Sequence, residues 1–94
     1  MVPPRIDVAR VHALVRSQRV VPHPLKYHAG RHGIGFAECL AALERCYAVQ
    51  ADERLPDAWY ALARHTHRRT LRIDFDTFED EAGDILLLVT AYHV

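Results

Sequence analysis

The stretch that decides the fold is TLRIDFDTFEDEAGDILLLVTAY, residues 70–92. Residues 70–77 alternate between apolar and polar side chains, which is typical of a strand with one buried face. Residues 84–92 are apolar on both faces, as expected for a central strand. A short polar connection that ends in Gly83 separates the two, so the sequence predicts an antiparallel hairpin.

The segment before the hairpin, residues 57–66, has two interpretations. A preceding proline, an aspartate and three alanines favour a helix, whereas the adjacent Trp59 and Tyr60 favour a strand. We interpret this segment as a third strand. The residues around Val49 leave a further short strand open.

Two helices are predicted in the first half of the chain. Within residues 6–19 valines recur at the spacing of one helix face, and the Pro-His-Pro sequence at 22–24 ends the pattern because proline lacks an amide donor. Residues 35–46 carry a second apolar stripe, which includes Phe36 and Leu40. Glycines and cations fill the segment between the two helices.

This order of elements predicts an α+β fold, in which the N-terminal helices pack on one face of a small antiparallel β-sheet. With 94 residues the chain is long enough for one modest core and too short for two. We therefore expect a single domain over residues 1–94, with the first helix in 1–20 and the core in 21–94. A hydrophobic content of 50% and a charged content of 26% exclude a disordered tail.

The charge of the chain is zero in sum but divided along its length. Lys and Arg number 12, as do Asp and Glu. All 12 cations and six of the acids lie in residues 1–72, which therefore carry +6. Residues 73–94 hold the other six acids and no Lys or Arg, and carry −6. Such segregation is compatible with an anionic partner, which the net charge alone argues against.

The sequence carries no sign of export or of membrane insertion. Arginines recur among the N-terminal residues, so we expect no secretory signal. No stretch approaches the roughly 20 apolar residues of a membrane helix. Cys39 and Cys46 lie about 10 Å apart along the predicted second helix, too far for a disulfide. Two reduced thiols favour a cytoplasmic location.

The densest group of cationic and titratable side chains ends within the first hairpin strand. Its members are Arg64, His65, His67, Arg68, Arg69 and Arg72. Such a group predicts a surface that binds phosphate. If this segment is extended, His65 and His67 point the same way with Cα atoms about 6.6 Å apart, which suits a phosphate or a metal ion. If it forms a turn, the arginines are simply solvated.

Aromatic side chains offer a second means of binding a single-stranded nucleic acid. Tyr60, Tyr92 and Trp59 have faces on which a base can stack, although Trp59 fits a place in the core better. The seven histidines raise the question of zinc, but the sequence has no Cys-x-x-Cys or His-Glu-x-x-His pattern. We therefore predict no dedicated metal site and no cofactor.

The segment RHGIGFAE, residues 31–38, resembles the Lys-His-Gly-Val-Ser-Phe-Glu-Glu signature that opens the second helix of BrnT-type toxins. These are small members of the RelE superfamily of ribonucleases. The acidic turn after this helix, the next strand with its basic end, and the two strands that follow are also similar to the family layout. The similarity covers about residues 23–94 and implies a RelE/BrnT-like core at 21–94. The family usually begins with a strand, where this chain has a helical pattern. Its last strand often ends in an arginine, where Tyr92 and His93 stand here.

The resemblance implies a toxin of a toxin–antitoxin pair that cleaves RNA. Attack of the 2′-hydroxyl on the phosphodiester needs a base, an acid and a cation that stabilises the phosphorane, and it needs no metal. The candidate catalytic residues are Arg31, His32, His65 and His67. The candidate RNA-binding residues are Arg64, Arg68, Arg69 and Arg72. The partners are RNA and a cognate antitoxin whose acidic segment covers the same basic face.

Two rival functions stay open. The first is a non-catalytic interaction module that forms homo-oligomers by docking its basic patch on the acidic hairpin of another copy. The second, weaker rival is a metal-dependent enzyme built on the histidines. The acidic residues at 79–84 also fit a solvated hairpin tip, and residues 31–33 fit a solvated turn before the second helix.

Overall fold

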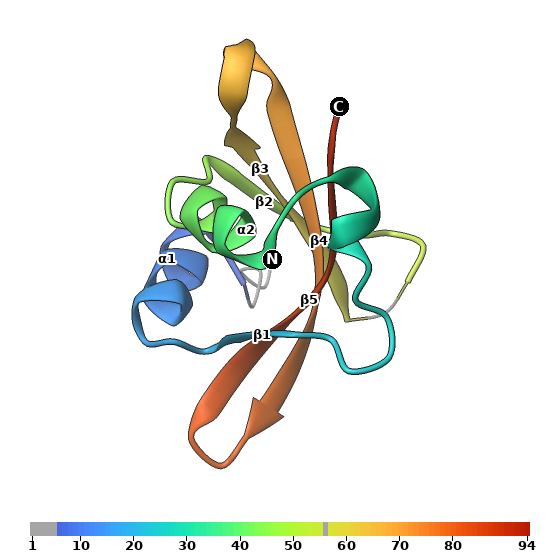
Figure 1. Cartoon of the computed structure of the whole chain (residues 1–94). Helices are drawn as coiled ribbons and strands as arrows, with labels where there is room; N and C mark the ends of the chain where they lie inside the picture. The colour runs from blue at the N-terminus through green and yellow to red at the C-terminus, as the bar shows by residue number, and fades with distance from the viewer. Residues whose placement is uncertain (1–5, 56) are drawn as a thin grey trace.

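Figure 1 shows the computed structural model, which describes residues 6–55 and 57–94; the side chain of His67, a candidate catalytic group, lies outside the described part. Within this part the chain is an α+β domain. The helices are α1 (Val8–Arg16) and α2 (Phe36–Leu43), with short 3-10 helices η1 (Ala29–His32) and η2 (Thr66–Arg68). The strands are β1 (Val20–Pro22), β2 (Ala48–Ala51), β3 (Ala58–Arg64), β4 (Thr70–Asp80) and β5 (Gly83–His93).

The strands form one mixed sheet in the order β1-β5-β4-β3-β2. From β2 to β5, successive strands are antiparallel neighbours, and β3 confirms the interpretation of residues 57–66 as a strand. β2 likewise provides the short strand around Val49. β1, however, pairs in parallel with β5, with Val20 opposite Leu86. The prediction of a wholly antiparallel sheet is therefore wrong at this edge.

The short length of β1 explains why the sequence pattern did not reveal it. Two β-branched valines favour an extended backbone, and Pro22 is tolerated because β1 is an edge strand, in which its missing amide hydrogen costs no bond to β5. Three residues are too few to show an alternation. The long connection from β1 to β5 is what allows the two strands to run in parallel.

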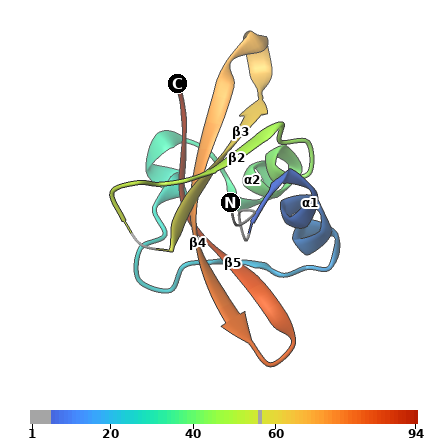
Figure 2. The same ribbon diagram turned by 180° about the vertical axis from the view of Figure 1, so that it is seen from behind.

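The predicted hairpin is confirmed, and its strands are longer than expected. β4 continues to Asp80 and β5 begins at Gly83, so two residues connect them. Gly83 has a φ of 119°, which favours glycine strongly. In Figures 1 and 2 the tip of the hairpin projects beyond the rest of the sheet, at the opposite end of the molecule from η2 and the C-terminus.

The core lies between one face of the sheet and the two helices, which pack side by side (Figure 1). The predicted apolar face of β4 is buried, and Leu71, Ile73 and Phe75 are at most 1% exposed. On the neighbouring strand Ala61 and Ala63 are fully buried, and their small side chains leave room for α2. The alternation in the hairpin therefore decides which face the helices cover.

Both helices are shorter than predicted. α1 begins after Asp7, whose carboxylate accepts a hydrogen bond from the Arg10 amide at 2.8 Å. It ends before Gln18, which has a φ of 60°. Ile6 and Cys46 lie outside the two helices but are at most 3% exposed. The apolar pattern thus runs past the helix ends because the flanking turns also face the core.

Gly33 ends η1 with a φ of 74°, whereas Gly30, inside η1, has no positive φ. An added Cβ would meet nothing within 4 Å at either position. We expect Gly33→Ala to lower the free energy of unfolding by about 1 kcal/mol through backbone strain alone. The control Gly30→Ala should raise it by about 0.4–1 kcal/mol, because alanine restricts the unfolded chain. Urea denaturation measures both changes. Equal losses of unfolding free energy in the two variants would contradict the conclusion that the positive φ of Gly33 requires glycine.

Candidate functional site

Folding brings the oppositely charged parts of the chain together. Nη2 of Arg10 lies 3.3 Å from Oδ2 of Asp84, and Nη2 of Arg19 lies 2.5 Å from Oδ1 of Asp80. α1 and the turn after it therefore contact the acidic hairpin. The hydrogen bond donated by Arg19 holds the pKa of Asp80 below its ordinary value. The hairpin therefore has cationic partners within the chain and is more than a solvated acidic tip.

Residues 64–69, from the last residue of β3 to the residue before β4, are here named the arginine loop. Unlike Arg10 and Arg19, the arginines of this loop have no acidic side chain paired with them in the described part of the chain. Arg64, Arg68 and Arg69 are exposed, and none of them forms an ion pair within residues 6–55 and 57–94. The His65 amide donates to the Arg69 carbonyl at 2.8 Å, which closes the loop into a turn around η2. The extended alternative is thus wrong, and His65 and His67 are not neighbours on one face of a strand.

His65 is the centre of a hydrogen-bonded series of three side chains. Its Nε2 lies 3.2 Å from Oε2 of Glu38, in the first turn of α2. Its Nδ1 lies 2.8 Å from Nε2 of His93, at the end of β5. The His65 side chain is 9% exposed. Three elements that are distant in the sequence thus meet in the Glu38–His65–His93 series, beside the arginine loop.

The surroundings of His93 lower its proton affinity. Burial lowers the pKa of His93 most, Arg69 and His65 lower it further, and Glu38 opposes them. Because the pKa is below its ordinary value, the imidazole stays neutral to a lower pH than that of a free histidine. A neutral imidazole beside an arginine suits a base that acts on a phosphate ester.

Arg72 lies apart from the arginine loop, on the face of the sheet opposite the helices. Its guanidinium carbon is 4.0 Å from the centre of the Tyr60 ring and 5.9 Å from that of Tyr92. Its Nε donates to Asp74 at 2.9 Å, and its Nη2 lies 3.8 Å from Asp52. The charge of Arg72 is therefore matched within the protein, unlike the charges of the arginine loop.

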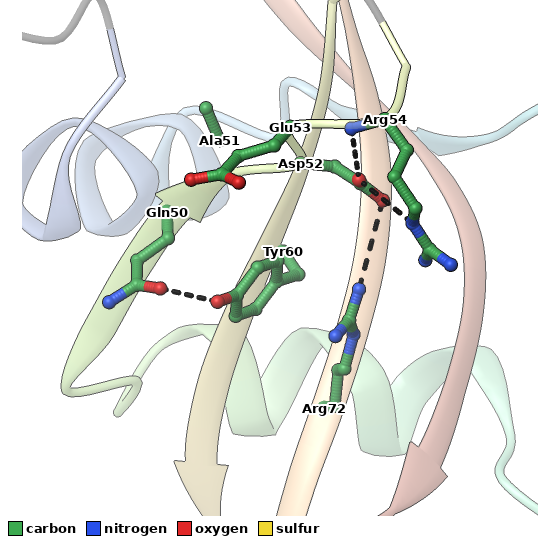
Figure 3. Close-up of a pocket in the computed structure, with 7 residues that line it drawn as sticks. All are labelled: Gln50, Ala51, Asp52, Glu53, Arg54, Tyr60 and Arg72. Carbon is green, nitrogen blue, oxygen red and sulfur yellow. Dashed lines mark hydrogen bonds and ion pairs between the residues drawn. The ribbon is translucent and has the colours of Figure 1, made fainter.

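A pocket of about 330 Å³ opens beside Arg72 (Figure 3). Its lining residues are Gln50, Ala51, Asp52, Glu53, Arg54, Tyr60 and Arg72. In Figure 3 the carboxylate of Asp52 lies between the guanidinium groups of Arg54 and Arg72, and the Tyr60 hydroxyl donates to Gln50. Two cations and two anions line this pocket, so its charge is balanced and does not by itself select an anion.

Arg31 and His32 lie in η1, which packs against β5, and both are exposed. The ring of His32 is centred 5.8 Å from that of Tyr92. Tyr92 and His93 are successive residues of a strand, so their side chains point to opposite faces of the sheet. His32 therefore meets β5 on one face, and the histidine series meets it on the other. The structure therefore does not bring His32 and His65, the candidate histidines whose side chains it describes, into a single cluster.

The sequence pattern did not identify Glu38 and His93 as site residues. Neither residue was among the candidate catalytic or RNA-binding residues. The two lie far from His65 along the chain, His93 at a separation of 28 residues, so no local spacing links them. The available signals were the place of Glu38 in the 31–38 segment and that of His93 where the family often has an arginine.

The two cysteines lie in the core, Cys39 on α2 and Cys46 beyond its end. Cys39 and Cys46 are free, and burial raises the pKa of each thiol to about 11, so both are protonated at neutral pH. Nε2 of His12 lies 3.2 Å from the carbonyl oxygen of Cys46, to which it donates a hydrogen bond. Because Nε2 of His12 carries a proton for this bond, it has no free lone pair with which to deprotonate the Cys46 thiol. Among the described residues no group of three or more His, Cys, Asp or Glu is arranged to hold a metal ion.

No helix in the described ranges is long and apolar enough to cross a membrane. Comparisons of the chain with protein-family models, with curated proteins and with solved structures found no significant match. The resemblance to BrnT-type toxins thus rests on residues 31–38 and on the layout of the elements. The geometry around the arginine loop carries the functional proposal.

Proposed function

We propose that the protein is a small cytoplasmic endoribonuclease toxin, which cleaves RNA by metal-independent attack of the 2′-hydroxyl and is held in check by a cognate antitoxin. The observation that carries this proposal is the arginine loop beside the Glu38–His65–His93 series. Exposed cations without acidic partners there lie next to two hydrogen-bonded imidazoles. This is the combination that phosphodiester cleavage requires.

The arginine loop supplies the affinity for the RNA backbone. A guanidinium group binds phosphate oxygens in pairs, and Arg64, Arg68 and Arg69 present three such groups on one turn. Arg31, exposed in η1, adds a further cation near β5. On the open face of the sheet the rings of Tyr60 and Tyr92 offer stacking surfaces for unpaired bases on either side of Arg72.

The cleavage chemistry divides between the same groups. An arginine of the loop stabilises the negative charge that develops on the phosphorane. The histidine series takes the proton of the 2′-hydroxyl. Arg31 and His32 are exposed on the other face of β5 from the series, so they are candidates for binding the RNA strand beyond the scissile phosphate.

The order of the elements after α2 supports a RelE-like fold for residues 21–94. After α2, β3 ends at Arg64 in front of the arginine loop, and β4 and β5 follow. A strand that ends in basic residues and two further strands are the layout on which the resemblance rests.

The antitoxin is expected to present an acidic segment to the arginine loop, in competition with RNA. Self-association is the rival, and the opposite ends that the loop and the hairpin tip occupy would allow head-to-tail docking. The hairpin, however, already contacts Arg10 and Arg19 of its own chain. A second copy would therefore have to displace these ion pairs, which favours RNA over another copy as the partner of the loop.

Removal of two loop charges tests the proposal. Arg68→Gln combined with Arg69→Gln should lower the affinity for single-stranded RNA and reduce the slope of log K against log salt by about 1.4, since each phosphate contact contributes about 0.7. Fluorescence anisotropy at a series of salt concentrations measures the slope, and a labelled RNA shows cleavage on a gel.

Arg16→Gln is the matched control, because Arg16 is also exposed but lies at the end of α1. It should leave both affinity and slope nearly unchanged. RNA binding that does not depend on salt contradicts the proposal, and so does an equal loss of affinity in the loop double variant and in Arg16→Gln. A salt-sensitive oligomer without RNA affinity, detected by light scattering, favours the self-associating module instead.

A further inference from the structure

When both imidazoles are neutral, the contacts of the Glu38–His65–His93 series define which ring nitrogen carries each proton. A carboxylate can only accept hydrogen bonds, so Nε2 of His65 carries the proton that faces Glu38 at 3.2 Å. The Nδ1 of neutral His65 is then an acceptor, and the 2.8 Å contact requires that Nε2 of His93 donates to it. It follows that Nδ1 of His93 carries no proton and is the one ring nitrogen of the pair without a partner in the series.

We propose that His93 is the acid–base residue of the site, acting through Nδ1, and that His65 and Glu38 are positioning residues that hold it in this state. The inference rests on the proposed RNA cleavage for its substrate, the 2′-hydroxyl of a ribonucleotide. His65 does not act directly, because both of its ring nitrogens are engaged and its side chain is 9% exposed. His93 is only partly buried and lies at the end of β5.

The series takes up one proton and places the resulting positive charge next to the Glu38 carboxylate. Nδ1 of His93 forms a bond to the hydroxyl proton as the O–H bond breaks, and the freed electron pair on oxygen attacks phosphorus. The Nε2 proton of His93 passes to Nδ1 of His65, so the positive charge comes to lie on His65, against the Glu38 carboxylate. The reverse transfer returns the proton from Nδ1 of His93 to the leaving oxygen or to water, and atoms and charge balance.

The pair accepts only one extra proton at ordinary pH. A second proton would place an N–H group against another N–H group across the 2.8 Å contact and would put two imidazolium charges side by side. The charged groups around His93 are Arg69 from the arginine loop and His65, which disfavour its protonation, and Glu38 from α2, which favours it. Arg69 therefore keeps His93 in its basic form, and Glu38 restores part of its proton affinity.

Glu38→Gln tests the relay, because glutamine keeps the shape and an oxygen acceptor but removes the charge. The protonated pair loses its counterion, so the acidic limb of the kcat/KM profile should move to lower pH by about 1 unit. Glu44→Gln is the matched control, since Glu44 caps the other end of the same helix and is exposed. It should leave the profile where it is.

His93→Asn should lower kcat/KM by about 10²–10⁴-fold with little change in RNA affinity. His12→Asn is its control, as His12 lies outside the series and bonds to a backbone carbonyl. Circular dichroism and urea denaturation check that each variant is folded. Retention of activity in folded His93→Asn would overturn the assignment of the catalytic role.

Ring ¹⁵N chemical shifts measure the proton positions without reference to activity. Both His65 and His93 should carry their proton on Nε2, with Nδ1 of His93 unprotonated until the pair titrates. A proton on Nδ1 of His93, or a profile that Glu38→Gln leaves unmoved while wild-type protein cleaves RNA, overturns the relay and leaves the proposed function standing. The expected proton positions in a protein that cleaves no RNA overturn the catalytic role together with the proposed function.

Discussion

Phe75→Ala is expected to lower the free energy of unfolding by about 3–5 kcal/mol. Phe75 is the largest fully buried side chain of the described core and is 1% exposed. On β4 it lies between Trp59 of β3 and Leu88 of β5, beneath the two helices. Its removal leaves a cavity that these neighbours cannot fill, because each is fixed by its own strand.

The size of this loss matters because domains of this length have total stabilities of about 5–14 kcal/mol. Urea denaturation followed by circular dichroism should show a lower midpoint with an unchanged m-value. Phe78→Ala is the matched control, since Phe78 lies on the same strand but is 56% exposed. It should cost about 1 kcal/mol or less. Similar losses for both would show that Phe75 does not occupy the core.

Ala61→Leu is expected to lower the free energy of unfolding by about 1–3 kcal/mol through overpacking. Ala61 is fully buried at the middle of β3, where it pairs with Ile73 on one side and Val49 on the other. Its side chain points to the face on which α2 packs against β3. Three extra carbon atoms there would push the helix away from the sheet.

Ala37→Leu provides the control for this change, because Ala37 lies on the exposed side of α2. The same atoms are added in both variants, and both substitutions keep a residue that suits its element. The exposed change should alter the free energy of unfolding by no more than about 0.5 kcal/mol. A thermal melt of each variant separates the two cases, and a tolerated Ala61→Leu would contradict the close approach of α2 to β3.

Most of the sheet was predictable because one buried face imposes a period of two on each strand. The alternation in residues 70–77 identified the buried side chains of β4, and the continuous apolar run of β5 placed that strand inside the sheet. The aromatic pair Trp59 and Tyr60 favoured a strand over a helix for β3, correctly, because Trp59 packs against the core.

The parallel edge strand was not predictable in the same way. β1 has three residues, and its place in the sheet comes from backbone bonds to β5, such as that from the Leu86 amide to the Arg19 carbonyl just before β1. Backbone pairing of this kind leaves no mark in the pattern of side chains. The turn at η2 was open in the sequence for a related reason, since Arg64, Arg68 and Arg69 are compatible with either a turn or a strand.

The candidate site divides in the same manner. The arginines of the loop were predictable, because a local concentration of cations exposed at a turn remains a basic surface whatever the rest of the chain does. The partners of His65 were not, because Glu38 and His93 approach it only when α2 and β5 pack at the same end of the sheet. Arg72 was grouped with the loop but lies on the open face, paired with Asp74.

The sequence by itself determined the local elements: a hairpin with one apolar face, two amphipathic helices before it, and a basic segment that leads into it. Periodicity suffices there, because burial of one face acts on neighbouring residues. The tertiary structure decided which charges are matched and which imidazoles share a proton. Ion pairs such as Arg19–Asp80 and the contact of His65 with His93 join residues that only the packing of the helices and β5 brings within hydrogen-bonding distance.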